Sequence, residues 1–513
     1  MIDLKMIYNR SETFAQKAVF GLFVLLGFLL VLQSIISPAF VVAFVLAVSL
    51  LLVTILRPLW SLFLLAVYLP FESIILKFTP DDAYLFARYL SEGLVYLVLA
   101  VVVVKILTNK IEIRQSPIDL PFFLFGVVLL ASSLINAVSP WIAVLGIRQI
   151  IRFMLVFFLV VHLRPTKEFI KNLLLTMFFI VVFQSVLGLM QWGIGESLDA
   201  ILLPSEARNY GSIVLTEGVQ QFWEPGTRIF STLGRYDRLG NFLYIFLLMT
   251  AGFAFVKKSM PDKLILGLSF LVGLPALLLT YSRSSWFAFI IGFLFIGVYL
   301  MKNKKIALFT GAIVIVLAGY IAASGLQVRF ITESPGQTIT ERFYESFSYA
   351  RWRGEYYGLG RVFWYVHTPL TVVPSSPIFG VGPGQFGGGA VTALGNSKVY
   401  EELGLPFGVF GTEGFIDNNW FALWGETGTL GWALYIWMFA ALFTFGVKTF
   451  RESKDPFVRA VAVGVCAVIL GISFNAFTST VFEIRTSAYY LWLLAGCMVV
   501  LRQREIEGAK NKV

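Results

Sequence analysis

Long apolar stretches, separated by short polar gaps, run along most of the 513-residue chain. A helix needs about 20 mostly apolar residues to cross the hydrocarbon core of a bilayer. The pattern therefore predicts an all-α polytopic integral membrane protein with about fourteen transmembrane helices. The predicted spans are residues 18–36, 39–56, 58–76, 84–107, 118–136, 141–163, 167–192, 238–256, 261–281, 284–301, 305–324, 418–446, 457–479 and 484–502.

Lysine and arginine gather in every second gap between these spans. Positive charge is retained on the cytoplasmic side of a membrane, so the alternation predicts that both termini are cytoplasmic. The two longest polar segments then face outward. The predicted regions are N-terminal helices in 1–192, an outer segment at 193–237, central helices in 238–324, a large outer loop at 325–417, C-terminal helices in 418–502 and a cytoplasmic tail at 503–513.

The large outer loop at 325–417 is rich in aromatic side chains, which are typical of order at a membrane interface. We therefore expect an ordered periplasmic loop with short amphipathic helices near 341–347 and 356–367. A glycine-rich run at 380–389 predicts tight turns. It lacks the Lys-Ser/Thr of a phosphate loop, which argues against an activated-nucleotide substrate.

Composition agrees with this class, because 58% of the residues are hydrophobic and only 14% are charged. The net charge of +10 is explained by the basic gaps. The sequence lacks a basic stripe with interleaved aromatics, the pattern that would indicate a nucleic-acid partner. Cys466 and Cys497 fall within apolar stretches and are expected to be buried thiols. With two histidines, His162 and His367, lying far apart, the sequence predicts neither a metal site nor a cofactor.

Arg148 and Arg152 lie inside one predicted span and, four residues apart, share one helix face. A charged residue near the bilayer centre costs at least about 2.5 kcal/mol on insertion scales. The pair could be neutralised by an acidic side chain or reach the interface. Few acidic residues lie within the spans, which favours an external anion as the partner.

Arg283 lies in an outer turn, where a positive charge runs against the topology rule. It is flanked by Ser282 and Ser284, whose hydroxyls can donate to phosphate oxygens. Arginine binds phosphate through two parallel N–H donors. This turn therefore predicts a phosphate-binding site, with a simple interfacial turn as the alternative.

Asp417 opens a predicted span and is a candidate general base, because partial desolvation raises the pKa of a carboxylate. It could instead cap the helix N-terminus. Glu426 lies more than two turns deeper and could orient the base or pair with an arginine. His367 is a second candidate base, since its ordinary pKa suits the task.

Several motifs, taken in order, resemble the O-antigen ligase and polymerase superfamily of bacterial envelope glycosyltransferases. They cover most of the chain in layout. Asp417 stands where the family has a histidine. The matching segments are GIRQIIR at 146–152, RIFSTLG at 228–234 followed by Asp237, SRSSW at 282–286, PIFGVGPGQF at 377–386 and DNNWFALWGETGTLG at 417–431.

The resemblance implies an inverting, metal-independent glycosyl transfer in the bacterial inner membrane, with the active site facing the periplasm. The donor would be a glycan on undecaprenyl diphosphate, and the acceptor a lipid-linked glycan or lipid A core. Arg148, Arg152 and Arg283 would bind the diphosphate, and Asp417 or His367 would deprotonate the acceptor. Further substrate-binding candidates in the outer segments are Arg228, Asp237, Arg238 and Arg361.

Three products stay open within this superfamily: a polymerised repeat-unit glycan, a glycan on lipid A core and a glycoprotein. The aspartate in place of histidine and the large number of spans favour the polymerase. A lipid-linked oligosaccharide flippase is the alternative from another class. Flippases have short loops and internal repeats, whereas this chain has a long outer loop and no convincing repeat.

Overall fold

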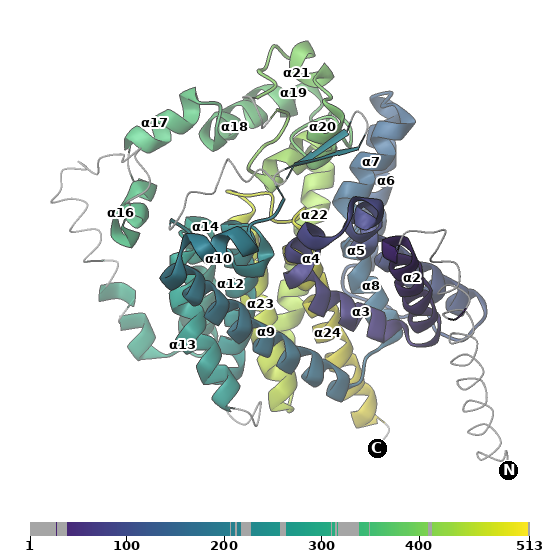
Figure 1. The fold of residues 1–513 in the computed structure, drawn as a ribbon, viewed down its shortest axis with the longest axis vertical. Coiled ribbons are helices and arrows are strands. Elements are labelled where there is room, and N and C mark those ends of the chain that lie inside the picture. Colours follow the sequence, from purple (N-terminus) through teal and green to yellow (C-terminus); the bar gives the residue numbers. More distant parts are fainter. Residues whose placement is uncertain are drawn as a thin grey trace.

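The computed structural model describes residues 38–205, 207–210, 213–216, 227–256, 263–308, 310–312, 338–347, 349–408 and 413–510, together with residues 27 and 315. These residues form a bundle of long helices with a layer of short helices over one end, which we call the outer end (Figure 1). The predicted span 18–36 lies almost entirely outside the described residues, as does most of 305–324.

The N-terminal helices follow the predicted spans, with two breaks. Pro70 lies in a short 3₁₀ turn that divides the third predicted span. The span at 141–163 is two helices bent by 57° relative to each other. The elements are α2 (Pro38–Leu56), α3 (Pro58–Tyr68), η1 (Leu69–Phe71), α4 (Glu72–Phe78), α5 (Asp81–Leu107), α6 (Asp119–Ile135), α7 (Pro140–Ile151), α8 (Met154–Leu163) and α9 (Lys167–Ile194).

The centre of the bundle is formed by α12 and α23, whose side chains are mostly buried, with the other central helices packed around them. A helix that is hydrophobic all round belongs in the interior, and α12 packs against α13, α14 and α23. Cys466 and Cys497 are buried free thiols in this core, as predicted. The elements are α12 (Tyr236–Phe255), α13 (Lys263–Leu279), α14 (Arg283–Leu294), the π-helix η3 (Phe295–Leu300), α22 (Asn419–Glu452), α23 (Pro456–Asn475) and α24 (Arg485–Lys510).

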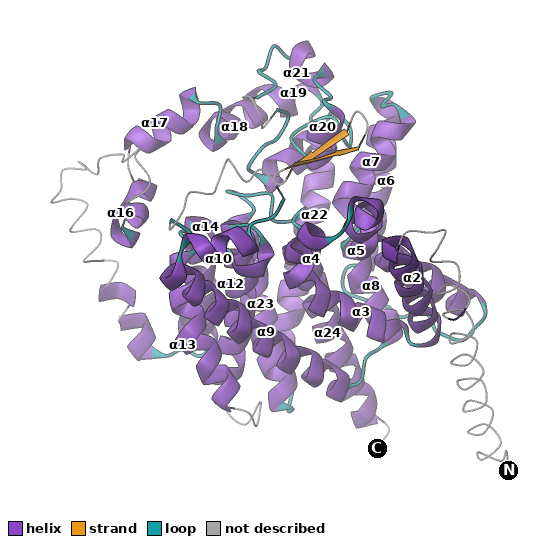
Figure 2. Cartoon of the chain, viewed as in Figure 1, coloured by secondary structure: helices purple, strands orange, loops and turns teal. Residues whose placement is uncertain are grey.

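The described parts of the two outer segments are mostly short helices. Figure 2 shows one antiparallel hairpin, which follows α10 and precedes η2 along the chain. The sequence predicts no strand there. The elements are α10 (Glu196–Leu202), β1 (Ala207–Tyr210), β2 (Ile213–Thr216), η2 (Ser231–Leu233), α16 (Ile339–Tyr344), η4 (Glu345–Phe347), α17 (Tyr349–Tyr357), α18 (Arg361–His367), η5 (Thr368–Val372), α19 (Val373–Ser375), α20 (Gly389–Leu394) and α21 (Lys398–Glu402).

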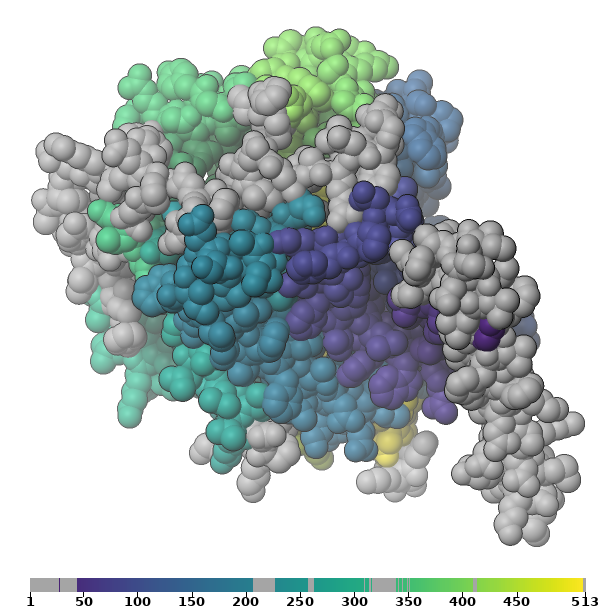
Figure 3. All heavy atoms as spheres, in the orientation of Figure 1, coloured from purple at the N-terminus to yellow at the C-terminus, as the bar shows by residue number. Residues whose placement is uncertain are grey.

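Residues 349–408 cover the outer end of the bundle as a layer, coloured green in the space-filling view (Figure 3). Helices are present at both places where short amphipathic helices are expected. The second of them begins at Arg361, because a turn at 358–360 separates α17 from α18. This layer brings polar side chains of the loop over the helix ends beneath it.

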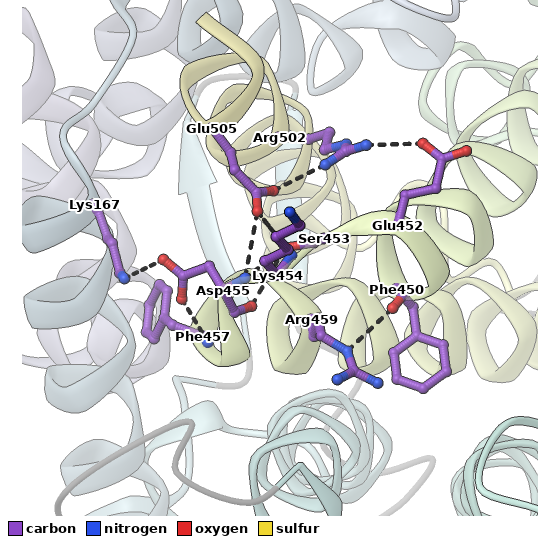
Figure 4. Close-up of polar contacts among 10 residues, drawn as sticks. All are labelled: Lys167, Phe450, Glu452, Ser453, Lys454, Asp455, Phe457, Arg459, Arg502 and Glu505. Carbon is purple, nitrogen blue, oxygen red and sulfur yellow. Dashed lines mark hydrogen bonds and ion pairs between the residues drawn. The ribbon is translucent and has the colours of Figure 1, made fainter. Parts of the chain in front are cut away.

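Basic residues from several predicted cytoplasmic gaps meet at the end of the bundle opposite this layer, where α24 ends (Figure 1). Figure 4 shows how α9, α22, α23 and α24 are joined there by ion pairs and hydrogen bonds. The contacts shown are Lys167 with Asp455, Arg502 with Glu452 and Glu505, Glu505 with Ser453 and the backbone of Lys454, and Arg459 with the Phe450 carbonyl.

Among the described residues, seven helices are long and apolar enough to cross a membrane, or eight if the bent pair α7 and α8 is one span. The helices and breaks establish a polytopic helical membrane protein. The count of fourteen spans and the orientation of the two ends stay predictions.

Candidate active site

A cavity of about 400 Å³ opens at the outer end, between the long helices and the layer of short ones. Its walls come from the start of α12, the turn before α14, the helices α16 to α18, and the end of α23. Five arginines line it, together with three acidic side chains and an aromatic wall. The charged lining residues are Arg235, Arg283, Arg342, Arg351, Arg361, Asp237, Glu355 and Asp417.

The turn before α14 places Ser282, Arg283 and Ser284 in the cavity wall, as the sequence pattern predicts. Tyr281 has a positive φ of 53°, which turns the chain sharply into the helix. The Ser282 hydroxyl lies 2.9 Å from that of Ser285, which donates to the buried Asn241 side chain at 3.0 Å. The turn is thus fixed from behind while Arg283 faces the cavity.

Asp417 also lines the cavity, and its side chain is 47% exposed. One of its carboxylate oxygens accepts a hydrogen bond from an Arg361 Nη atom at 3.1 Å. Asn418, rather than Asp417, caps helix α22, because its side chain accepts from the Phe421 N–H. The capping alternative for Asp417 is therefore wrong, and this carboxylate faces the cavity.

Arg361 is held by two acidic neighbours. Burial opposes its charge, but Asp417 and Glu355 outweigh burial and raise the pKa of Arg361 above its ordinary value. Glu355 is also partly buried, yet Arg361 and Arg351 lower the pKa of its carboxyl. Both side chains are consequently charged at neutral pH, and Arg361 can present positive charge to a ligand.

The segment 227–235 reaches the cavity because two glutamines on α9 hold it. Gln191 accepts from the backbone N–H groups of Phe230 and Ser231 at 3.0 and 2.9 Å. Gln184 binds the side chains of Ser231 and Thr232. Buried amides thus satisfy a backbone turn inside the bundle, and the chain leaves this turn directly at the cavity wall.

Arg235 and Asp237 form a 3.1 Å ion pair in that wall. The Arg228 guanidinium lies 4.3 Å from the ring centre of Tyr236, which also lines the cavity. Arg238 is directed elsewhere, with an Nη atom 3.5 Å from the Ser73 hydroxyl. Asp237 therefore lines the cavity. Arg228 contacts the lining residue Tyr236 but is not itself a lining residue, and neither is Arg238.

Glu426 supports the glycine-rich turn. Its buried carboxylate accepts from the backbone N–H of Gly384 at 2.8 Å. Gly380 has a φ of +70°, and a Cβ atom there would lie 2.4 Å from the Gly428 backbone nitrogen. These contacts hold the turn against the start of α22, and Glu426 does not line the cavity.

His367, the second candidate base, does not line the cavity either. Its ring stacks on Phe363 with centroids 4.0 Å apart, and its Nε2 lies 3.4 Å from the Tyr356 hydroxyl. Of the two candidates, only Asp417 is in the cavity wall.

Arg148 and Arg152 lie near the bend between α7 and α8 and are not among the cavity-lining residues. Glu92 on α5 accepts from both, at 2.9 Å from Arg148 and 3.3 Å from Arg152. Arg152 also donates to the Glu483 backbone carbonyl at 2.9 Å. The contacts support the alternative that an acidic side chain neutralises this pair, because α5 brings the buried carboxylate of Glu92 to it.

Sequence reasoning did not assign a role to Arg342, Arg351, Glu345 or Glu355. Their only signal in the sequence is a density of arginine in the outer loop that is unusual for an outer segment. Their convergence requires α16 and α17 to fold over α14.

The fold and the charged cavity at one end of the bundle define a polytopic membrane protein with an arginine-rich cavity. Within this class, a family model described as O-antigen ligase matches residues 268–436. The match confirms the resemblance to the O-antigen ligase and polymerase superfamily. It runs from α13 to α22 and includes Arg283, Arg361 and Asp417. A comparison with curated proteins found no match.

Proposed function

We propose that the chain transfers a glycan from undecaprenyl diphosphate to a hydroxyl of an acceptor sugar, on the periplasmic face of the bacterial inner membrane. The observation that carries this proposal is the cavity in which five arginines, from five separate elements, line the same walls as the carboxylate of Asp417. The arginines suit a diphosphate, the carboxylate suits an acceptor hydroxyl, and the family match supports a glycosyltransferase of this type.

In the proposed reaction, the acceptor oxygen attacks the anomeric carbon and the bond from that carbon to the diphosphate breaks. Asp417 takes the hydroxyl proton, and undecaprenyl diphosphate leaves with the bonding electrons. Arg283 and its neighbours stabilise the charge that develops on the leaving group. A single displacement of this kind inverts the anomeric configuration and needs no metal ion.

The cavity also has an aromatic wall that includes Phe287, Phe347 and Trp352. Aromatic side chains supply apolar area for sugar rings or for the lipid part of the donor. Among the possible acceptors we prefer a lipid-linked glycan, which would make the protein a repeat-unit polymerase, because Asp417 stands in place of the ligase histidine. Lipid A core and protein acceptors are the competing assignments.

The test is a reconstitution with purified full-length protein, undecaprenyl-diphosphate-linked repeat units from its host, membrane lipids and EDTA, without nucleotide. We expect a ladder of longer lipid-linked glycans by gel and mass spectrometry. Arg283→Ala and Asp417→Asn should abolish it, whereas Arg238→Gln, a change outside the cavity, should preserve it. No transfer to lipid-linked glycan, lipid A core or protein would refute the proposal.

A further inference from the structure

Three of the cavity arginines converge on one buried carboxylate. Glu345, whose side chain is 2% exposed, accepts from Arg283 at 3.2 Å, from Arg342 at 2.8 Å and from Arg351 at 3.2 Å. The three arginines come from α14, α16 and α17, so Glu345 joins one transmembrane helix to two helices of the outer layer.

The charge of this group is opposite in sign to that of the proposed donor. Three guanidinium groups and the Glu345 carboxylate sum to +2, and the sum is still positive when Glu355, the second partner of Arg351, is counted. A diphosphate esterified at both ends, as in a lipid-diphosphate-linked glycan, carries about −2. Without Glu345, three like charges would face one another in a partly desolvated site, where their repulsion is stronger than in water. The carboxylate therefore allows the arginines to converge and still leaves a positive excess at the cavity wall.

The contacts continue from this group toward the candidate base. Arg351 also forms an ion pair with Glu355. Glu355 accepts from the Arg361 backbone N–H at 3.1 Å, and the Arg361 guanidinium donates to Asp417 at 3.1 Å. Alternating charges thus link the three arginines to Asp417, which places the anion-binding part and the proton-accepting part of the cavity in one network.

We infer that Glu345 is a positioning residue that assembles a diphosphate-binding site from Arg283, Arg342 and Arg351. This inference rests on the proposed function for the identity of the ligand, and it assigns diphosphate binding to two arginines of the outer layer. Glu345 itself does not contact the ligand, since the arginines surround its carboxylate. The packing of α16 and α17 over α14 completes the site.

The test measures binding of inorganic pyrophosphate to the purified full-length protein by calorimetry at fixed ionic strength. Arg351→Gln should weaken binding about tenfold or more, because charge-assisted hydrogen bonds are lost. Arg353→Gln is the matched control, since Arg353 is an exposed residue of the same helix that lies over the Tyr357 ring. It should bind like the native protein.

Glu345→Gln should also weaken pyrophosphate binding, because the new amide N–H₂ group faces arginine donors and the three side chains can no longer converge. In the transfer assay it should raise the KM for the donor more than it lowers kcat, a split that general loss of folded protein would not produce. Glu341→Gln is the control, because glutamine also serves at this capping position.

Tighter pyrophosphate binding by Glu345→Gln would overturn the inference, since Glu345 would then be a competitor of the ligand. Equal effects of Arg351→Gln and Arg353→Gln would overturn it as well. Pyrophosphate binding that depends on these residues, in a protein without transfer activity, would support the site and refute the proposed function. Transfer activity that is unchanged in these variants would support the proposed function and refute the inferred diphosphate-binding site.

Discussion

Replacing Glu92 with glutamine should separate the two interpretations of Arg148 and Arg152. Glu92 is 4% exposed and is the carboxylate that both arginines contact. If its role is to neutralise them, Glu92→Gln leaves Arg152, which is 8% exposed, with a buried and uncompensated charge.

The expected cost follows from the burial of each partner. Removing one partner of a buried ion pair costs about 3–5 kcal/mol. Arg148 is 34% exposed and Arg152 keeps the Glu483 carbonyl as an acceptor, so the lower end, about 3 kcal/mol, applies here. Adding Arg152→Gln removes the orphaned charge, and the double variant should be less destabilised than the sum of the two single variants.

The assay is thermal unfolding of the purified protein at one heating rate, followed by tryptophan fluorescence, with pyrophosphate binding measured on the same samples. We expect Glu92→Gln to lower the unfolding temperature clearly and to leave pyrophosphate affinity unchanged. A variant with unchanged unfolding temperature that no longer binds pyrophosphate would refute this reasoning, because Arg148 and Arg152 would then serve an external anion.

Three further outcomes are expected. Asp417→Asn should lower kcat about 10²–10⁴-fold, the range for loss of a general base, with pyrophosphate affinity retained, whereas a comparable loss in His367→Gln would reassign the base. Gly380→Ala should lower the unfolding temperature, because its φ is +70° and a Cβ atom would meet the Gly428 backbone; unchanged stability would show that the turn is not held as described. The pKa of the Glu355 carboxyl lies below its ordinary value, so its contribution to stability is present above about pH 4.5 and is lost as pH falls through its folded-state pKa. Across that acid range, the unfolding temperature should fall less in Glu355→Gln than in the native protein. Parallel curves for the two proteins would contradict this.

Much of the helical framework follows from the sequence, because a bilayer-length apolar run leaves few other structures. Within the described residues, each predicted span corresponds to a helix or to a broken pair of helices. The bend between α7 and α8 was not predicted, since no proline or glycine marks residues 151–154 and the bend depends on packing.

The sequence identified those cavity residues that depart from an expected pattern. Arg283 is positively charged in a predicted outer turn, and Asp417 stands at a helix start within a family motif. Contacts between distant segments were not predictable in the same way. Glu92 neutralises the pair on α7 and Glu345 gathers three arginines only because tertiary packing brings their helices together. Glu426 was expected to orient the base or pair with an arginine, whereas its carboxylate accepts from the backbone N–H of Gly384, a contact that only tertiary packing creates.

The most direct measurement of the central claim is a cryo-electron microscopy map of the full-length protein in a lipid nanodisc with undecaprenyl diphosphate, the proposed leaving group. We expect density for the two phosphates in the outer cavity, against Arg283, Arg342 and Arg351, with the lipid extending toward the membrane. Density at Arg148 and Arg152, with an empty outer cavity, would contradict it.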